Sequence, residues 1–176
     1  PAVVSPSNCC VVGIGSPHGE ERAGWLVVDR LQPEWEFRSS SGGASIRFEK
    51  AAVPHDLLDW LDTADTVHVV DASMDAVPSV RRYEVRANAD SERLELVAGD
   101  HSQTSQLLHG LRSSSSHQFD LLQVLQLGWS LRRLPRRLVL WTISVVAVEA
   151  DDAVSSETQL RIGECTRRIS GELWCA

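Results

Sequence analysis

Apolar runs alternate with amphipathic stretches along most of the chain, which is the pattern of strands and helices packed in layers. Strands are predicted at 9–14, 66–70, 82–85 and 138–148, and a strand or hairpin is expected within 34–50. Helices are predicted at 21–32, 56–61, 118–128 and 155–169, the first of them ending at Pro33. This alternation predicts an α/β fold whose sheet is covered on both faces. Because we find no internal repeat and no linker, residues 1–176 are expected to form a single domain.

One segment departs from this pattern. Residues 87–116 are polar, contain little helical periodicity and end in a run of serines. Long polar loops in compact domains often serve a function. We therefore interpret this segment as a candidate flap that contacts a substrate.

Composition narrows the possible partners. The chain of 176 residues carries a formal charge of −7 at pH 7, which argues against a general affinity for nucleic acid or for an anionic membrane surface. No apolar run approaches the roughly 20 residues that a membrane span needs, and no signal-peptide pattern is found. We expect a cytoplasmic monomer. The four cysteines form no CxxC pair and are expected to be reduced: Cys9, Cys10, Cys165 and Cys175.

A glycine-rich loop follows the first strand and leads into the first helix. Gly13, Gly15 and Gly19 predict a turn whose backbone takes positive φ and passes close to a ligand or another chain segment. Such a loop could hold a dinucleotide pyrophosphate at a helix N-terminus. Glu20 and Glu21 argue against this ligand, because they place negative charge where the phosphates would lie. A cation or a polar backbone segment suits the loop better.

Two further residues complete a possible metal site. Asp71 closes the strand predicted at 66–70, and His117 precedes the helix predicted at 118–128. Glutamate, aspartate and histidine together suit zinc, nickel, iron or manganese. Each residue alone also has a common structural use, as a helix cap or as an acid at a helix N-terminus. Only their combination therefore indicates a metal site.

The order of these motifs resembles that of the hydrogenase maturation proteases, endopeptidases that trim the C-terminus of the large subunit of nickel–iron hydrogenases. The loop from Gly13 to Gly24 matches the opening motif of the family, with Glu20-Glu21 in the place of its acidic pair. Asp71 matches the family's strand-end aspartate, and Ser115-Ser116-His117-Gln118 matches its Ser-x-His-Gln. The resemblance spans roughly residues 9–170. Ser16 stands where the family usually has asparagine.

The resemblance implies a three-layer α/β/α fold, with a twisted, mostly parallel central sheet flanked by helices. It also implies a metal site made of Glu21, Asp71 and His117. The implied activity is that of a metal-dependent, aspartyl-type endopeptidase, which removes the C-terminal extension of a nickel-loaded large-subunit precursor. Nickel would arrive with this substrate, and zinc or cadmium is expected to occupy the site in vitro.

Catalysis would then need no serine or cysteine nucleophile. Water that is polarised by the metal, or activated by Asp71 or Glu21 as a general base, would attack the peptide carbonyl. Residues expected to contact the substrate are Gly13, Gly15, Ser16, Glu20 and Gln118. The sequence leaves open whether Glu20 or Glu21 points into the cleft, because a shift of one residue in the loop exchanges them.

Two other functions fit parts of the sequence. A Rossmann-like dinucleotide-binding protein would need a residue that reads the ribose after the second strand, and Glu36 is the candidate nearby. A non-catalytic relative of the proteases would bind a C-terminal peptide without cutting it.

Overall fold

The computed structural model describes residues 8–38, 45–74, 77–88, 93–98, 116–145 and 153–174, and within 116–120 it describes the backbone alone. The strands are β1 (Cys9–Ile14), β2 (Ile46–Ala51), β3 (Thr66–Ser73), β4 (Val80–Asn88), β5 (Arg93–Ala98) and β6 (Arg137–Ser144). The α-helices are α1 (Ala23–Arg38), α2 (Ser116–Ser130) and α3 (Ser156–Trp174). Two short 3₁₀ helices are η1 (Gly19–Arg22) and η2 (Pro54–Asp59).

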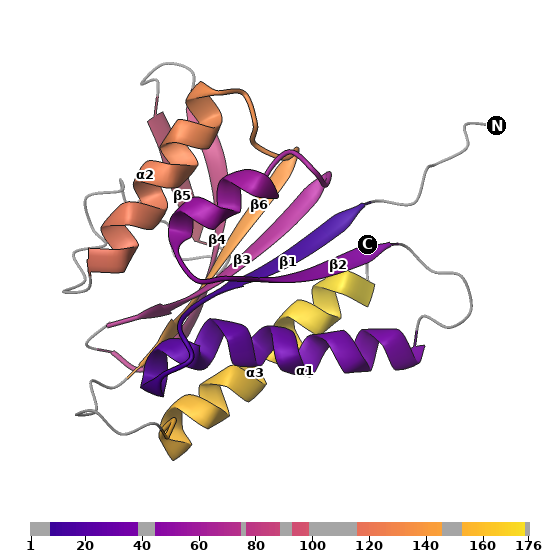
Figure 1. Cartoon of the computed structure of the whole chain (residues 1–176), viewed down its shortest axis with the longest axis vertical. Helices are drawn as coiled ribbons and strands as arrows, with labels where there is room; N and C mark the ends of the chain where they lie inside the picture. Colours follow the sequence, from indigo (N-terminus) through magenta and orange to yellow (C-terminus); the bar gives the residue numbers. More distant parts are fainter. Residues whose placement is uncertain are drawn as a thin grey trace.

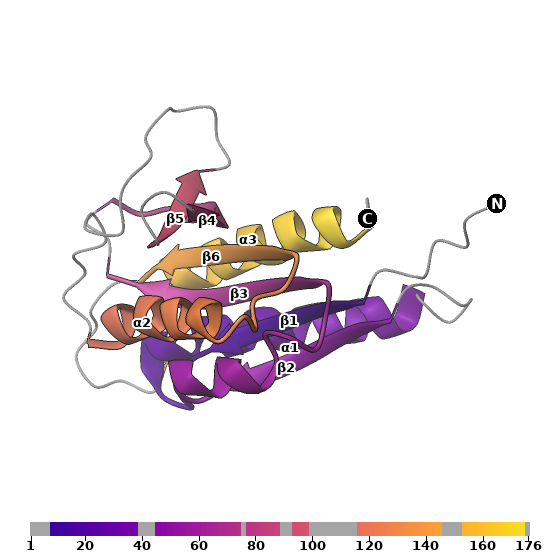
Figure 2. The same cartoon turned by 90° about the horizontal axis from the view of Figure 1, so that it is seen from above.

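The six strands form one mixed sheet in the order β2-β1-β3-β6-β4-β5 (Figure 2). Strands β2, β1, β3 and β6 are parallel, whereas β4 and β5 run antiparallel to their neighbours. The sheet has β2 on one side of β1 and β3 on the other, so the chain leaves β1 at a topological switch point. Such points open a crevice at the carboxyl ends of the strands.

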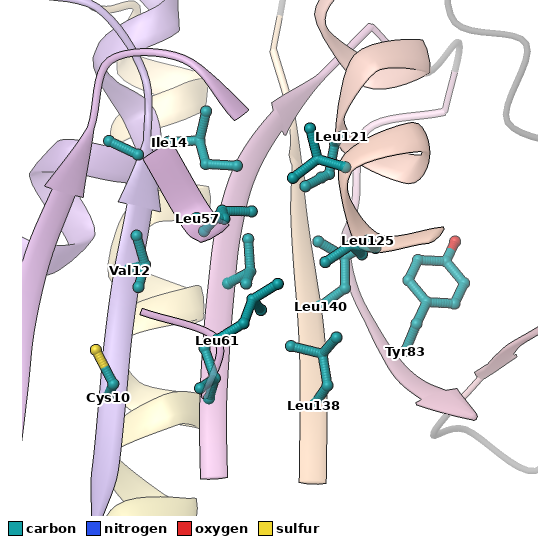
Figure 3. Packing of buried hydrophobic residues seen from close by; sticks show 14 of the residues in the cluster. Cys10, Val12, Ile14, Leu57, Leu61, Tyr83, Leu121, Leu125, Leu138 and Leu140 are labelled. Carbon is teal, nitrogen blue, oxygen red and sulfur yellow. The ribbon is translucent and has the colours of Figure 1, made fainter. Parts of the chain in front are cut away.

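Helices cover both faces of this sheet, which confirms the predicted three-layer α/β/α fold (Figure 1). Side chains alternate between the faces along β3, so that Val69 packs in the layer of α2 and η2 while Val70 packs in the layer of α1 and α3. Figure 3 shows the first of these layers, where Leu121 of α2 lies at the same end of the sheet as Ile14. The first turn of α2 therefore lies at the end of the sheet where β1 ends.

Helix α1 does not end at Pro33, as the sequence predicts, but continues to Arg38. A proline inside a helix removes one backbone hydrogen bond, at a cost of about 3 kcal/mol. Contacts with α3 offset this cost: the Trp35 and Trp174 rings have centroids 4.5 Å apart, and the Arg38 guanidinium lies 5.4 Å from the centre of the Trp174 ring. Tertiary packing thus overrides the local helix-stop signal.

Other predicted elements differ in detail. Within 34–50, residues up to Arg38 are helical and the strand β2 covers only Ile46–Ala51. The helix predicted at 56–61 is the 3₁₀ helix η2. The candidate flap at 87–116 contains the end of β4 and the unpredicted strand β5, while residues 89–92 and 99–115 lie outside the described part of the chain. The last residues of the run at 138–148 also lie outside it.

The described cysteines are free thiols buried in the core: Cys9, Cys10 and Cys165. Burial raises the pKa of Cys9 to about 12 and that of Cys10 to about 11, because the thiolate loses its hydration. Burial likewise raises the pKa of Cys165. None of the helices within the described ranges is long and apolar enough to cross a membrane.

Candidate active site

A cavity of about 100 Å³ lies at the carboxyl ends of β1 and β3, at the switch point of the sheet. Its lining residues are Ile14, Gly15, Ser16, Glu21, Ala52, Asp71, Ala72, Met74 and Val145. Two of these carry carboxyl groups, and most of the others are apolar. The volume has room for several water molecules or for a hydrated ion.

The glycines of the loop permit the close packing of β1 against α1. A Cβ atom on Gly13 would lie 2.2 Å from the carbonyl oxygen of Gly24, and one on Gly15 would lie 2.3 Å from that of Glu21. Among Gly13, Gly15 and Gly19, only Gly19 has a positive φ, of 51°. Close approach to the chain's own backbone is therefore what Gly13 and Gly15 accommodate.

Glu21 lines the cavity from η1, just before α1 begins. Its carbonyl oxygen accepts a hydrogen bond from the Ser16 N–H at 3.4 Å, which closes the loop. The Ser16 hydroxyl in turn accepts a hydrogen bond from the His18 N–H at 3.3 Å. These contacts place Ser16 and Glu21 on the same wall of the cavity.

Asp71 lies opposite this loop near the end of β3, with 5% of its surface exposed. Its Oδ2 atom is buried and has no hydrogen-bond partner among the described residues. Burial raises the pKa of Asp71 to about 7, a hydrogen bond from the Ala72 backbone N–H lowers it, and the negative charge of Glu21 raises it. The carboxyl group can therefore take up and release a proton near neutral pH.

Glu20 points away from Glu21 toward α3. Its Oε1 atom accepts a hydrogen bond from the backbone N–H of Ser155 at 2.8 Å. The side chain is buried, and its Oε2 atom has no partner among the described residues. Of the two adjacent acids, Glu21 is the one that lines the cavity.

The predicted histidine ligand stands in the first turn of α2, which begins at Ser116. This turn lies at the edge of the sheet where β1 ends (Figure 3), so the backbone of His117 is near the end of the sheet that carries the cavity. The side chains of His117 and Gln118 lie outside the described part of the structure. Among the described side chains, no group of three or more histidines, cysteines and acids is arranged to hold a metal ion.

Thr142 is a polar neighbour of the site that the sequence did not single out. It pairs with Asp71 in the register of β3 and β6. Its hydroxyl oxygen is buried without a hydrogen-bond partner among the described residues. In the sequence, Thr142 and Ser144 are polar residues within an otherwise apolar run. Because threonine is common in strands, this interruption does not by itself mark a residue of the site.

No protein-family model and no curated protein sequence matches the chain. Solved structures do resemble it. The hydrogenase-maturating endopeptidase HybD from Escherichia coli has a TM-score of 0.62 at 15% identity, over 92% of this chain and 89% of that one. The [NiFe] hydrogenase maturation protease HybD from Thermococcus kodakarensis has a TM-score of 0.62 at 12% identity, over 94% and 98%.

A third structure, the hydrogenase 2 maturation peptidase from a Thaumarchaeota archaeon, has a TM-score of 0.58 at 18% identity and covers 94% of this chain and 97% of that one. At these identities the similarity establishes the fold. The chain has the fold of the hydrogenase maturation proteases over nearly its whole described length, as the order of its motifs predicts.

Proposed function

We propose that the protein is an endopeptidase that removes the C-terminal extension of a nickel-loaded hydrogenase large-subunit precursor. The observation that carries this proposal is the placement of Glu21 and Asp71 in one cavity at the switch point of a maturation-protease fold. Two acids brought together in a largely apolar cavity are costly unless they bind a cation or share a proton. A bound cation can polarise a peptide carbonyl, and a shared proton can be transferred during peptide hydrolysis.

The two described carboxyl groups are of a ligand type that suits a metal ion. The buried Asp71 Oδ2 atom has no hydrogen-bond partner among the described residues, and Glu21 faces the same cavity. Glu21 and Asp71, together with His117 from the first turn of α2, would hold nickel that the precursor carries into the site. When bound, the metal would mark a loaded precursor as ready for cleavage and would polarise the peptide carbonyl.

The protonation of Asp71 suits the hydrolytic step. The pKa of Asp71 is about 7 in the metal-free site, and a bound cation would lower it. A carboxylate oxygen of Asp71 that does not hold the metal would accept a proton from an attacking water molecule and return it. In this step the water oxygen bonds to the peptide carbonyl carbon and the C–N bond breaks. The proton that Asp71 took from water then passes to the nitrogen of the broken bond, so that the products are a carboxylic acid and an amine.

A dinucleotide-binding function receives less support from the same geometry. A pyrophosphate at the glycine loop would meet the side chain of Glu21 and would approach Asp71 across the cavity. Repulsion between the phosphates and a carboxylate in a poorly hydrated site is strong. The close contacts of Gly13 and Gly15 with the chain's own backbone also account for those glycines without a ligand.

The test is cleavage of a nickel-loaded large-subunit precursor, followed by intact-mass spectrometry. We expect the unmodified chain to release the C-terminal extension. Asp71→Asn and Glu21→Gln, which keep size while removing charge, are expected to lower the rate by at least about 100-fold. The same precursor without nickel is expected to stay intact.

Two results would support one of the alternative functions instead. A precursor that binds the protein but keeps its full mass would identify the non-catalytic, peptide-binding alternative. Quenching of tryptophan fluorescence by a dinucleotide, together with no effect of nickel or cadmium, would favour the Rossmann-like alternative.

A further inference from the structure

Two adjacent acids, Glu20 and Glu21, leave the loop between β1 and α1 in different directions. Both belong to η1, a 3₁₀ helix with about three residues per turn, so neighbouring side chains point roughly 120° apart. Glu21 lines the cavity, whereas Glu20 reaches the start of α3. The direction of one side chain therefore determines the direction of the other.

The partner of Glu20 is Ser155, the residue that immediately precedes α3. The Ser155 N–H donates to Glu20 Oε1 at 2.8 Å, and the Ser155 hydroxyl caps the helix by accepting a hydrogen bond from the Thr158 N–H at 3.2 Å. Helix α3 has 19 residues, and its N-terminus carries a partial positive charge that suits a carboxylate. Glu20 thus joins a loop of the site to a helix more than 130 residues away in sequence.

The other side of the loop is also fixed. The carbonyl of Ala51 at the end of β2 accepts hydrogen bonds from the Gly15 N–H at 3.1 Å and from the Trp25 indole N–H at 2.9 Å. The Ser16 N–H donates to the Glu21 carbonyl. Glu21 is held between these contacts and the contact of Glu20 with α3.

We infer that Glu20 is a positioning residue for Glu21: its carboxylate binds the start of α3 and so holds the Glu21 side chain toward the cavity. This inference rests on the proposed function, in which Glu21 is a metal ligand. It assigns the acidic pair two separate tasks. One acid faces the metal, and the other fixes the loop that carries it.

A purely structural role explains the burial of Glu20 less well. Its Oε2 atom is buried without a partner among the described residues, which is unfavourable for a carboxylate. An apolar side chain could fill the same space without that cost, but it could not accept the hydrogen bond from Ser155. What the acid adds over an apolar side chain is this hydrogen bond, which fixes the loop to the start of α3.

In the experiment, the unmodified chain and its variants are titrated with Cd²⁺ alone, and binding is measured by calorimetry. Glu20→Ala is expected to weaken Cd²⁺ binding by about 10-fold, the usual effect of removing a residue that orients a metal ligand. Glu20→Gln keeps an acceptor for Ser155 and is expected to bind within about threefold of the unmodified chain. Glu157→Ala removes an exposed acid from the first turn of α3, and serves as the control for a general effect of charge at this helix.

A double variant tests the contact itself. Ser155→Pro removes the donor N–H, whereas Ser155→Ala removes the capping hydroxyl and keeps that N–H. We expect Glu20→Ala combined with Ser155→Pro to bind Cd²⁺ no more weakly than Glu20→Ala combined with Ser155→Ala. Both double variants lack the hydroxyl, and the N–H that proline also removes has already lost its acceptor. Full additivity of the two effects, or unchanged Cd²⁺ binding by Glu20→Ala, would overturn the inference.

A second measurement does not depend on the metal. Amide hydrogen exchange is expected to become faster in Glu20→Ala, but not in Glu157→Ala, for peptides that cover 16–24 and 153–159. If the unmodified chain binds no Cd²⁺, the proposed function loses support while the exchange data still test the contact. Unchanged exchange in both peptides of Glu20→Ala would overturn the inference whatever the metal does.

Discussion

Asp71 on β3 and Thr142 on β6 are register partners, and each has a buried side-chain oxygen without a hydrogen-bond partner among the described residues. Paired residues of parallel strands project to the same face of a sheet. Val69 and Leu140, two residues earlier on each strand, pack in the layer of α2 and η2. Asp71 and Thr142 therefore form a buried polar pair at the end of an otherwise apolar layer.

Replacing Thr142 by valine should stabilise the fold. Valine has nearly the same shape but lacks the hydroxyl, whose burial without a partner costs about 1 kcal/mol or more. We expect Thr142→Val to raise the free energy of unfolding in urea by about 1 kcal/mol. Thr142→Ser, which keeps the hydroxyl and loses a methyl group, should lower it by a similar amount. A loss of stability in Thr142→Val would show that the hydroxyl has a partner after all.

The stability of the metal-free protein should fall as pH rises toward 7. Burial raises the pKa of Asp71 to about 7 in the folded state, so the folded chain holds this proton more tightly than the unfolded chain, where the pKa is about 3.8. The stabilisation is complete below about pH 4 and is lost as pH rises through 7.

We expect the difference in unfolding free energy between the unmodified chain and Asp71→Asn to shift by on the order of 2 kcal/mol between pH 5 and pH 8. Urea unfolding of both proteins in the presence of a chelator measures this difference in unfolding free energy. A difference that stays constant over this range would mean that Asp71 titrates near its ordinary pKa.

A single methyl group at Gly24 should disrupt the junction of β1 and α1. A Cβ atom there would lie 2.1 Å from the Ile14 carbonyl oxygen and 2.7 Å from that of Val70. Both are backbone atoms of central strands, so Gly24→Ala should destabilise the protein by about 3 kcal/mol. Gly171→Ala is the matched control: apart from its chain neighbours and the backbone of α3 itself, no described atom lies within 4 Å of the added carbon, and alanine should stabilise α3 by about 0.5–1 kcal/mol.

Replacing Pro33 by alanine should stabilise α1, because the new N–H can complete the helical hydrogen-bond pattern. We expect a gain of about 1–3 kcal/mol in chemical unfolding, reduced by the greater freedom of the unfolded chain. Pro54 provides the comparison, because it begins η2, where a missing N–H costs nothing. Equal effects of Pro33→Ala and Pro54→Ala would contradict this explanation.

The sequence predicts the central strands well because their signal is local. The strands predicted at 9–14 and 66–70 are mainly apolar runs, and burial on both faces is what such runs indicate; β1 has the predicted bounds, whereas β3 continues through Asp71 to Ser73. The length of α1 could not be predicted in this way, since it depends on the contact of Trp35 with Trp174. Strand β5 alternates buried Leu94 and Leu96 with more exposed residues, but its polar surroundings hide this pattern.

The candidate site could likewise be predicted only where the signal is local. Glu21 and Asp71 could be predicted as neighbours, because the ends of adjacent parallel strands meet at one edge of a sheet. The choice between Glu20 and Glu21 could not be predicted, since it depends on a hydrogen bond to Ser155, far along the chain. Thr142 could not be recognised either, because its importance follows from its register with Asp71.

The buried cysteines have a consequence for selectivity. Thiolates outcompete carboxylates for soft transition metals, so an accessible cysteine would draw nickel away from an oxygen-rich cleft. Cys9, Cys10 and Cys165 lie in the core, and their raised pKa values keep them protonated. In the proposed function the nickel must stay with the precursor, and these three buried thiols do not compete for it.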